Sequence, residues 1–181
     1  MTFDDIQSRA KSEWDSLYNG EITHILVGTA SCGRAAGALA VVEAFQKELA
    51  RKEAAAKVTE VGCIGLCSLE PLVTIIKPDS LTVCYGNVSP QVVPTLVDGY
   101  VLGDDPCFDL ALGTVERGED EAVYIPELPR FEHEQRLLLR NCGYNDPENI
   151  NHYIANGGYS GLAKVLKMTA RLSESRRLRC N

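Results

Sequence analysis

The sequence lacks several features that would place it in a membrane, an export pathway or a nucleic-acid complex. It has no apolar run near the ~18 to 20 residues that a membrane-spanning helix needs. No basic leader or apolar core follows Met1, because Asp4 and Asp5 come first. Basic residues number 18 against 25 acidic ones, a net charge of −7, and nucleic-acid binding needs clustered Lys and Arg. We therefore expect a cytoplasmic protein, free or peripheral to a membrane complex, with no direct membrane insertion and no nucleic-acid partner.

Cysteine is abundant for a chain of this kind. Seven cysteines in 181 residues are an odd number, and without an export signal a disulfide framework explains them poorly. Metal or redox chemistry is the better hypothesis. The cysteines stand at positions 32, 63, 67, 84, 107, 142 and 180.

The first hundred residues alternate helical and strand patterns. Thr2 and Asp5 form a capping-box pair at the start of one amphipathic helix, and Pro78-Asp79-Ser80 predicts a turn between two strands. The strand, helix, strand order that follows the first helix allows parallel pairing. The predicted class is α/β, a thioredoxin-like, ferredoxin-type small mixed sheet flanked by helices. The expected elements are helices at 2–18, 34–52 and 89–102 and strands at 21–27, 57–62, 72–77 and 81–85.

The chain beyond residue 103 has a different character. Between 104 and 121 seven acidic residues accompany one base, Arg117, and the hydrophobic pattern fails, which predicts an acidic linker over 104–123. A short helical segment follows over 124–170, with helices expected at 147–155 and 158–168, and it is too small to enclose a core without a partner surface. The arginine-rich residues 171–181 are expected to form an irregular tail. Residues 1–103 are then the main domain.

Three cysteines lie where the first two strands of that domain end. Cys63 and Cys67 form a C-x3-C motif with Gly62 and Gly65 beside them, and Cys32 lies in the loop after the preceding strand. Parallel neighbours place both loops at one edge of the sheet, so the three thiols should converge. Thiolates in such loops suit an iron–sulfur cluster or zinc. Small buried thiols are the alternative, and a disulfide oxidoreductase fits less well because those sites use C-x2-C.

Four stretches carry a resemblance to a known family. They resemble the N-terminal thioredoxin-like [2Fe-2S] ferredoxin domain, and the lead-in to the flavin domain, of FMN- and NADH-binding subunits. Such subunits occur in complex I-type NADH dehydrogenase and in the diaphorase parts of NAD(P)-reducing hydrogenases and formate dehydrogenases. The resemblance covers residues 21–168 and implies an electron-transfer module with a [2Fe-2S] cluster on Cys32, Cys63 and Cys67, in partnership with other subunits. The stretches are GTASCGRAAGA (28–38), EVGCIGLCSLEPLV (60–73), YGNVSP (85–90) and RNCGYNDPENINHYIANGGYSGLAKVLKM (140–168).

The sequence departs from that family at the first ligand position. The family places its first cysteine about five residues before the second, near Leu26 or Val27, and no cysteine stands there. The fourth ligand is then Cys84, His24, a partner residue or none. A clusterless docking domain and a zinc site of the three cysteines with His24 are the alternative interpretations. Cys107, Cys142 and Cys180 have no second ligand at metal spacing and are expected to be bystander thiols, with Cys142 packing against a flavin domain.

The second departure is the lack of the family's catalytic motifs. No glycine-rich phosphate loop and no later cysteine-rich motif follow residue 168, so we expect a truncated subunit. FMN and NAD would bind only to the remainder of such a subunit. This chain is therefore not expected to be catalytic alone.

Overall fold

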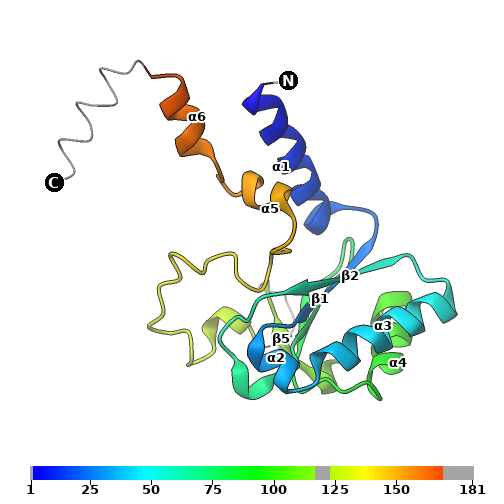
Figure 1. Ribbon diagram of the computed structural model, residues 1–181. Coiled ribbons are helices and arrows are strands. Elements are labelled where there is room, and N and C mark those ends of the chain that lie inside the picture. Colours follow the sequence, from blue (N-terminus) through cyan, green and yellow to red (C-terminus); the bar gives the residue numbers. More distant parts are fainter. Residues whose placement is uncertain (1, 117–122, 169–181) are drawn as a thin grey trace. The chain divides into compact units, whose positions relative to one another are not determined.

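The computed structural model describes residues 2–116 and 123–168 (Figure 1). These form two compact units, one of residues 2–15 with 148–168 and the other of residues 16–147. The expected tail at 171–181 lies outside the described residues, as do residues 117–122 of the predicted linker.

The larger unit is built on a five-stranded mixed sheet. Its strands are β1 (Thr23–Gly28), β2 (Ala56–Val61), β3 (Val73–Ile76), β4 (Val83–Tyr85) and β5 (Ala111–Thr114), in the order β2-β1-β3-β4-β5. Among the five described strands, β1 and β2 pair in parallel and the other neighbours in the sheet pair antiparallel. A β-α-β half followed by a β-β-α half is the thioredoxin-like arrangement. The predicted α/β class, with a small mixed sheet flanked by helices, is therefore confirmed.

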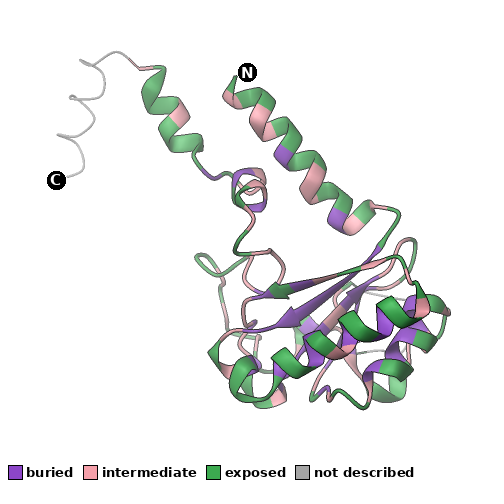
Figure 2. Cartoon of the chain, turned by 45° about the vertical axis from the view of Figure 1, so that its right-hand side comes forward, coloured by how far each residue is buried: buried purple, intermediate pink, exposed green. Residues whose placement is uncertain are grey.

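Helices cover one face of this sheet, and the main core lies beneath them. The helices are α2 (Ser31–Ala35), α3 (Ala38–Lys52), α4 (Val93–Leu96) and a π-helical turn, η2 (Val97–Leu102). The buried stripe of α3 (Figure 2) contains Val41, Phe45 and Leu49, which join Ile25, Val27, Ile75 and Tyr85 from the strands. Hydrophobic residues at helical spacing on α3 and at alternate strand positions meet there and leave water together.

Two helices differ from the prediction. The helix expected at 34–52 consists of α2 and α3, which Gly37 separates with a φ of +95°, so α2 begins before Cys32. The helix expected at 89–102 begins only at Val93, because Pro94 lacks an amide hydrogen and is tolerated only in a first turn.

The opposite face of the sheet is covered by the chain after residue 123. Strand alternation turns Cys84 away from its neighbours Val83 and Tyr85, and it packs with Ile64, Leu72 and Ile125. Leu128, Phe131 and Tyr144 lie against the same cluster, and Ile125–Glu127 form a 3-10 turn, η4. Part of the segment that was expected to need a partner surface therefore finds its cover within this chain.

The predicted linker also contains regular structure. A 3-10 turn, η3 (Phe108–Leu110), leads into β5, which pairs antiparallel with β4 through Val83–Thr114 and Cys84–Gly113. The prediction of an acidic linker over 104–123 did not anticipate this strand. Four residues of modest apolarity among acidic ones, ALGT, show too little alternation to predict a strand.

The smaller unit is helical. Helix α1 (Phe3–Asn19) begins with the predicted capping box, in which the Thr2 amide donates to Asp5 Oδ2 at 2.7 Å and the Asp5 amide to Thr2 Oγ1 at 3.2 Å. Helices α5 (Ile150–Ala155) and α6 (Ser160–Leu166) are the two predicted near the end of the chain. Among the described residues, no helix combines the length and apolarity required to cross a membrane.

Candidate metal centre

Three cysteine sulfurs meet at the carboxyl edge of the parallel strand pair. The register pairs Gly28 with Val61, so β1 and β2 end side by side, and the Thr29 amide donates to the Val61 carbonyl at 3.0 Å. Cys63 follows β2, Cys67 opens a 3-10 turn, η1 (Cys67–Leu69), and Cys32 stands in the first turn of α2. Their Sγ atoms all lie within 4.8 Å of one another. The structure thus brings together the three cysteines that the sequence singled out, with Cys32 on a helix instead of in a loop.

The spacing within the C-x3-C motif suits a shared metal ion. Cys63 Sγ and Cys67 Sγ are 3.7 Å apart. Two sulfurs bound at ~2.3 Å to one tetrahedral ion would be about 3.7 Å apart. Gly65 closes the loop with a φ of +97°, a conformation that side chains disfavour, and its amide donates to Cys63 Sγ at 3.2 Å. A backbone N–H pointed at sulfur favours the thiolate.

Without a cation the thiols of Cys32 and Cys63 hold their protons. Burial raises the pKa of the Cys63 thiol to about 12, opposed by the Gly65 amide and supported by the sulfurs of Cys32 and Cys67. Partial desolvation also raises the pKa of the Cys32 thiol. Neighbouring sulfurs cannot all ionise unless a positive ion compensates them. A bound metal would therefore replace protons at this site.

A buried carboxylate lies next to Cys32: that of Glu70, a site residue that the sequence pattern does not predict. Glu70 is 6% exposed, accepts a hydrogen bond from the Leu72 amide at 2.8 Å and places Oε1 3.7 Å from Cys32 Sγ. The Glu70–Pro71 peptide bond is cis. Glu70 thus links the turn before β3 to the first turn of α2. The sequence feature that could have indicated this residue is the acid in SLEPLV, shortly after the cysteine motif.

The two fourth-ligand candidates within this chain lie apart from the three sulfurs. His24 is the second residue of β1 and precedes the strand's last residue, Gly28, by four positions, or roughly 13 Å of extended chain. Cys84 is 1% exposed inside an apolar cluster, and burial raises the pKa of its thiol to about 11. Neither belongs to the group of sulfurs within 4.8 Å.

Cys142, which the sequence predicts to be a bystander thiol, lies beside the cysteine motif in the structure. A Cβ atom on Gly62 would lie 2.5 Å from Cys142 Sγ, so this sulfur rests against the residue that precedes Cys63. Cys142 is partly exposed. No periodic pattern in the sequence links two positions eighty residues apart.

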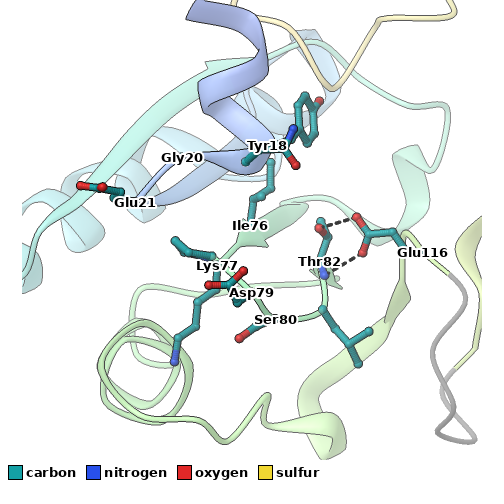
Figure 3. A pocket seen from close by; sticks show the side chains of 12 residues that line it. Tyr18, Gly20, Glu21, Ile76, Lys77, Asp79, Ser80, Thr82 and Glu116 are labelled. Carbon is teal, nitrogen blue, oxygen red and sulfur yellow. Dashed lines mark hydrogen bonds between the residues drawn. The ribbon is translucent and has the colours of Figure 1, made fainter. Parts of the chain in front are cut away.

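A polar hollow of about 850 Å³ lies at the other end of the sheet (Figure 3). Its walls come from residues 18–21 and from the β3–β4 turn, residues 76–82, with Glu116. The Glu116 carboxylate accepts hydrogen bonds from the Thr82 amide at 2.9 Å and from Thr82 Oγ1 at 2.8 Å (Figure 3). Lys77 is held by the Gly103 carbonyl and Asp104. These groups serve to join the β3–β4 turn to neighbouring segments.

The cysteine site fits an iron–sulfur centre in donor type. Soft thiolates on short loops, a backbone amide aimed at sulfur and partial exposure at a sheet edge are the surroundings that such centres use. Three cysteines meet there, where a [2Fe-2S] cluster takes four protein ligands. The chemistry of the donor set therefore fits, with one ligand still to be named.

Comparisons with known structures return ferredoxins. The chain is similar to two solved structures of a thioredoxin-like [2Fe-2S] ferredoxin from Aquifex aeolicus. One, of the wild type, is 24% identical, with 51% of this chain and 97% of that chain covered and a TM-score of 0.44. The other is 21% identical, with 55% and 98% covered and a TM-score of 0.46. No family model matches the chain.

Two curated relatives are subunits of the NADP-reducing hydrogenase of Solidesulfovibrio fructosivorans. Subunit HndC is 65% identical over 34 residues, which are 19% of this chain and 7% of HndC, so the chain spans only a small part of that relative. Subunit HndB is 31% identical over 108 residues, which are 58% of this chain and 85% of HndB. Because it matches most of that subunit at this identity, the chain belongs to the same protein family as HndB.

Proposed function

We propose that the chain is an electron-transfer module of a multi-subunit NAD(P)-linked oxidoreductase, carrying electrons on a [2Fe-2S] cluster held by Cys32, Cys63 and Cys67. The observation that carries the proposal is the convergence of the three sulfurs within 4.8 Å at one sheet edge. Membership of the HndB family supports a hydrogenase complex as the setting, and the sequence resemblance makes an NADH dehydrogenase complex the other setting that we propose. A bound [2Fe-2S] centre accepts and releases one electron at a time.

The residues of the chain would position and tune that centre. The Gly65 amide donates to Cys63 Sγ, and hydrogen bonds to sulfur tune the potential of such centres. Arg130 lies beside this loop, since its Nη2 atom would be 3.6 Å from a Cβ on Gly65. Its positive charge would stabilise the negative charge of the thiolates. The exposed side chain of Cys67 leaves one edge of the site open toward an electron partner.

Anaerobic purification, a visible spectrum and measurement of iron and acid-labile sulfide test the proposal. We expect about two irons and two sulfides per chain, and a one-electron signal in electron paramagnetic resonance (EPR) after reduction. Cys32→Ser, Cys63→Ser and Cys67→Ser should each lower the iron content, whereas Cys107→Ser is the matched control and should leave it unchanged. A colourless wild-type chain that takes up no iron on reconstitution would refute the proposal.

A clusterless docking domain of the same complex is the second candidate. The observation in its favour is that only three cysteines of the described residues lie within 4.8 Å of one another. This candidate predicts a colourless chain in which Cys32→Ser changes the free energy of unfolding little. A zinc site predicts zinc without labile sulfide.

The remaining assignments are part of the same proposal. Residues 1–103 would be the ferredoxin-type domain, 104–123 a linker and 124–170 the lead-in of a flavin-binding domain, whose FMN and NAD sites lie in another part of the subunit. Other subunits of the complex would be the partners, in the cytoplasm or at the periphery of a membrane complex. Mass spectrometry of the native complex would show whether a flavin-bearing polypeptide accompanies this chain.

A further inference from the structure

We infer that Cys142 is the fourth thiolate ligand of the centre held by Cys32, Cys63 and Cys67. The inference rests on the proposed function and names the ligand that the cysteine site lacks. It reassigns a residue from the segment after the acidic run to the cluster of the ferredoxin-type domain.

The first observation is the contact between Cys142 and the cysteine motif. Cys142 Sγ occupies the space that a Cβ on Gly62 would fill, with only 2.5 Å between the two positions. Gly62 is bonded directly to Cys63, so the sulfur of Cys142 lies at the start of the loop that carries two of the three ligands. A glycine at position 62 is required for this approach, because any side chain would displace the sulfur.

The second observation is that the same two loops meet again one residue further on. Gly143 has a φ of +90°, and a Cβ there would lie 2.1 Å from Ile64 Cγ2. The cysteine loop and the 141–143 turn thus each have a glycine at the point of contact: the Cys142 side chain packs on Gly62, and the Ile64 side chain packs on Gly143. Two matched close approaches fix the 141–143 turn on the cysteine loop more firmly than one contact could.

Packing around this contact holds the turn in place. Ile64 and Leu66, which lie inside the C-x3-C motif, are buried in one cluster with Ile125, and Tyr144 packs against it. The Tyr144 carbonyl also accepts a hydrogen bond from Tyr18 Oη at 3.3 Å. The turn that presents Cys142 therefore belongs to the same packed unit as the three ligands.

The position of Cys142 outside the close group of sulfurs suits a two-iron centre. Cys63 and Cys67, at 3.7 Å, have the spacing of two thiolates on one ion. A [2Fe-2S] cluster distributes four thiolates over two irons, so Cys142 would share the second iron with Cys32, and binding would draw Cys32 away from the Cys63–Cys67 pair that it approaches within 4.8 Å. Backbone hydrogen bonds within the turn, from the Cys142 amide to the Leu139 carbonyl at 3.0 Å and from the Tyr144 amide to the Asn141 carbonyl at 3.1 Å, hold the backbone that carries this thiol.

The other candidates fit less well. A cluster on Cys84 would have to enter the apolar cluster around Ile64, Leu72 and Ile125, where charge is strongly disfavoured. His24 lies within β1, away from its carboxyl end. Of the other cysteines in the described residues, Cys107 immediately precedes the η3 turn, and its sulfur approaches the Thr95 and Asp105 carbonyls. Cys142 is the remaining thiol beside the motif.

The test compares four full-length chains that are purified and reconstituted without oxygen: wild type, Cys142→Ala, Cys84→Ala and Cys107→Ala. We expect Cys142→Ala to retain less than half of the wild-type iron and labile sulfide and to shift the EPR spectrum of whatever cluster remains. Cys84→Ala and Cys107→Ala should match the wild type in both measurements. Circular dichroism of the metal-free proteins shows whether Cys142→Ala still folds, and Cys142→Ser gives a second readout, because an oxygen ligand would shift the EPR spectrum and the reduction potential.

A cadmium titration of the metal-free chains distinguishes a failure of the ligand inference from a failure of the proposed function. Thiolate-to-cadmium absorption grows with the number of bound thiolates, so we expect four thiolates in the wild type and three in Cys142→Ala. A wild type with two irons and a Cys142→Ala variant with the same iron content, EPR spectrum and potential would overturn the inference and leave the proposed function standing. A wild type without iron that binds cadmium through four thiolates would refute the proposed function alone. Three thiolates in both chains would overturn the inference.

Discussion

The contact between Gly62 and Cys142 predicts an energetic coupling that can be measured without any metal. Gly62→Ala places a methyl group 2.5 Å from Cys142 Sγ, well inside van der Waals contact, while the next atoms, Gly143 N and Cys142 Cβ, would be 3.6 and 4.0 Å away. The φ of Gly62 lies outside the left-handed region, so the backbone accepts alanine. The clash with one sulfur atom is therefore the main consequence of this substitution.

The magnitude follows from that geometry. Inserting a methyl group into a packed site costs about 1–3 kcal/mol, and we expect Gly62→Ala to lower the free energy of unfolding by this amount. In a Cys142→Ala background the clashing atom is gone. There Gly62→Ala should be neutral or stabilise the chain by about 0.4–1 kcal/mol, because alanine restricts the unfolded state. The coupling energy between the two positions should then be about 1–3 kcal/mol.

Urea unfolding of the metal-free chain, with chelator and reductant present, measures this cycle. The free energies of unfolding of the wild type, the two single variants and the double variant are compared, on condition that all four depend equally steeply on urea concentration. Gly161→Ala is the matched control, since a Cβ at Gly161 has no neighbour within 4 Å, and its effect should be the same with and without Cys142. Equal losses from Gly62→Ala in both backgrounds would show that Cys142 does not lie against Gly62, and the ligand inference would lose its geometric basis.

Three further predictions concern other parts of the chain. Burial raises the pKa of Cys84 from 9.0 to about 11. Between these pH values the folded state keeps a proton that the unfolded state releases, so the free energy of unfolding is unaffected below pH 9 and should fall by about 2–3 kcal/mol by pH 11. Urea unfolding of Cys84→Ala should show a shallower loss over that range, and equal pH slopes would contradict the reasoning. Glu116→Ala should cost about 1–3 kcal/mol because two donors of buried Thr82 lose their acceptor, and Glu116→Gln should cost less; equal stabilities by urea unfolding would refute this. Glu13→Ala removes the acceptor of Asn149 Nδ2 at 2.7 Å, so amide exchange in α5 should accelerate about tenfold while exchange in the sheet stays unchanged, and unaltered exchange in α5 would count against the contact.

The sequence predicted the fold where its signals were local and periodic. The continuous apolar run of β1 and the helical stripe of α3 mark the elements of the core, and a helical crossover of this length implies a parallel pair. That pairing alone brings Cys32 to the C-x3-C motif, so the convergence of the three sulfurs was predictable from spacing. Their role as ligands stays a prediction.

Other features could not be predicted because they depend on contacts distant in sequence. The strand β5 is short, and its pairing with β4 is supplied by tertiary context instead of by its own pattern. Glu70 is buried only because β3 follows it and α2 packs before it. The contact of Cys142 with Gly62 joins residues eighty positions apart, and no alternation or helical period reports such a pair.

The segment after the acidic run is tied to the cysteine motif by packing, quite apart from any resemblance in sequence. Ile125 and Tyr144 cover the apolar residues Ile64 and Leu66 within the motif, so removing the segment would expose them to water. A cluster ligand supplied from the same segment would add a covalent tie to this packing, because metal binding free energy becomes folding free energy. Under the proposed function, loss of the cluster should then loosen the segment as well as the cysteine loop. The segment and the cysteine loop would then lose order together when the cluster is lost. A docking domain without a metal centre predicts no such coupling.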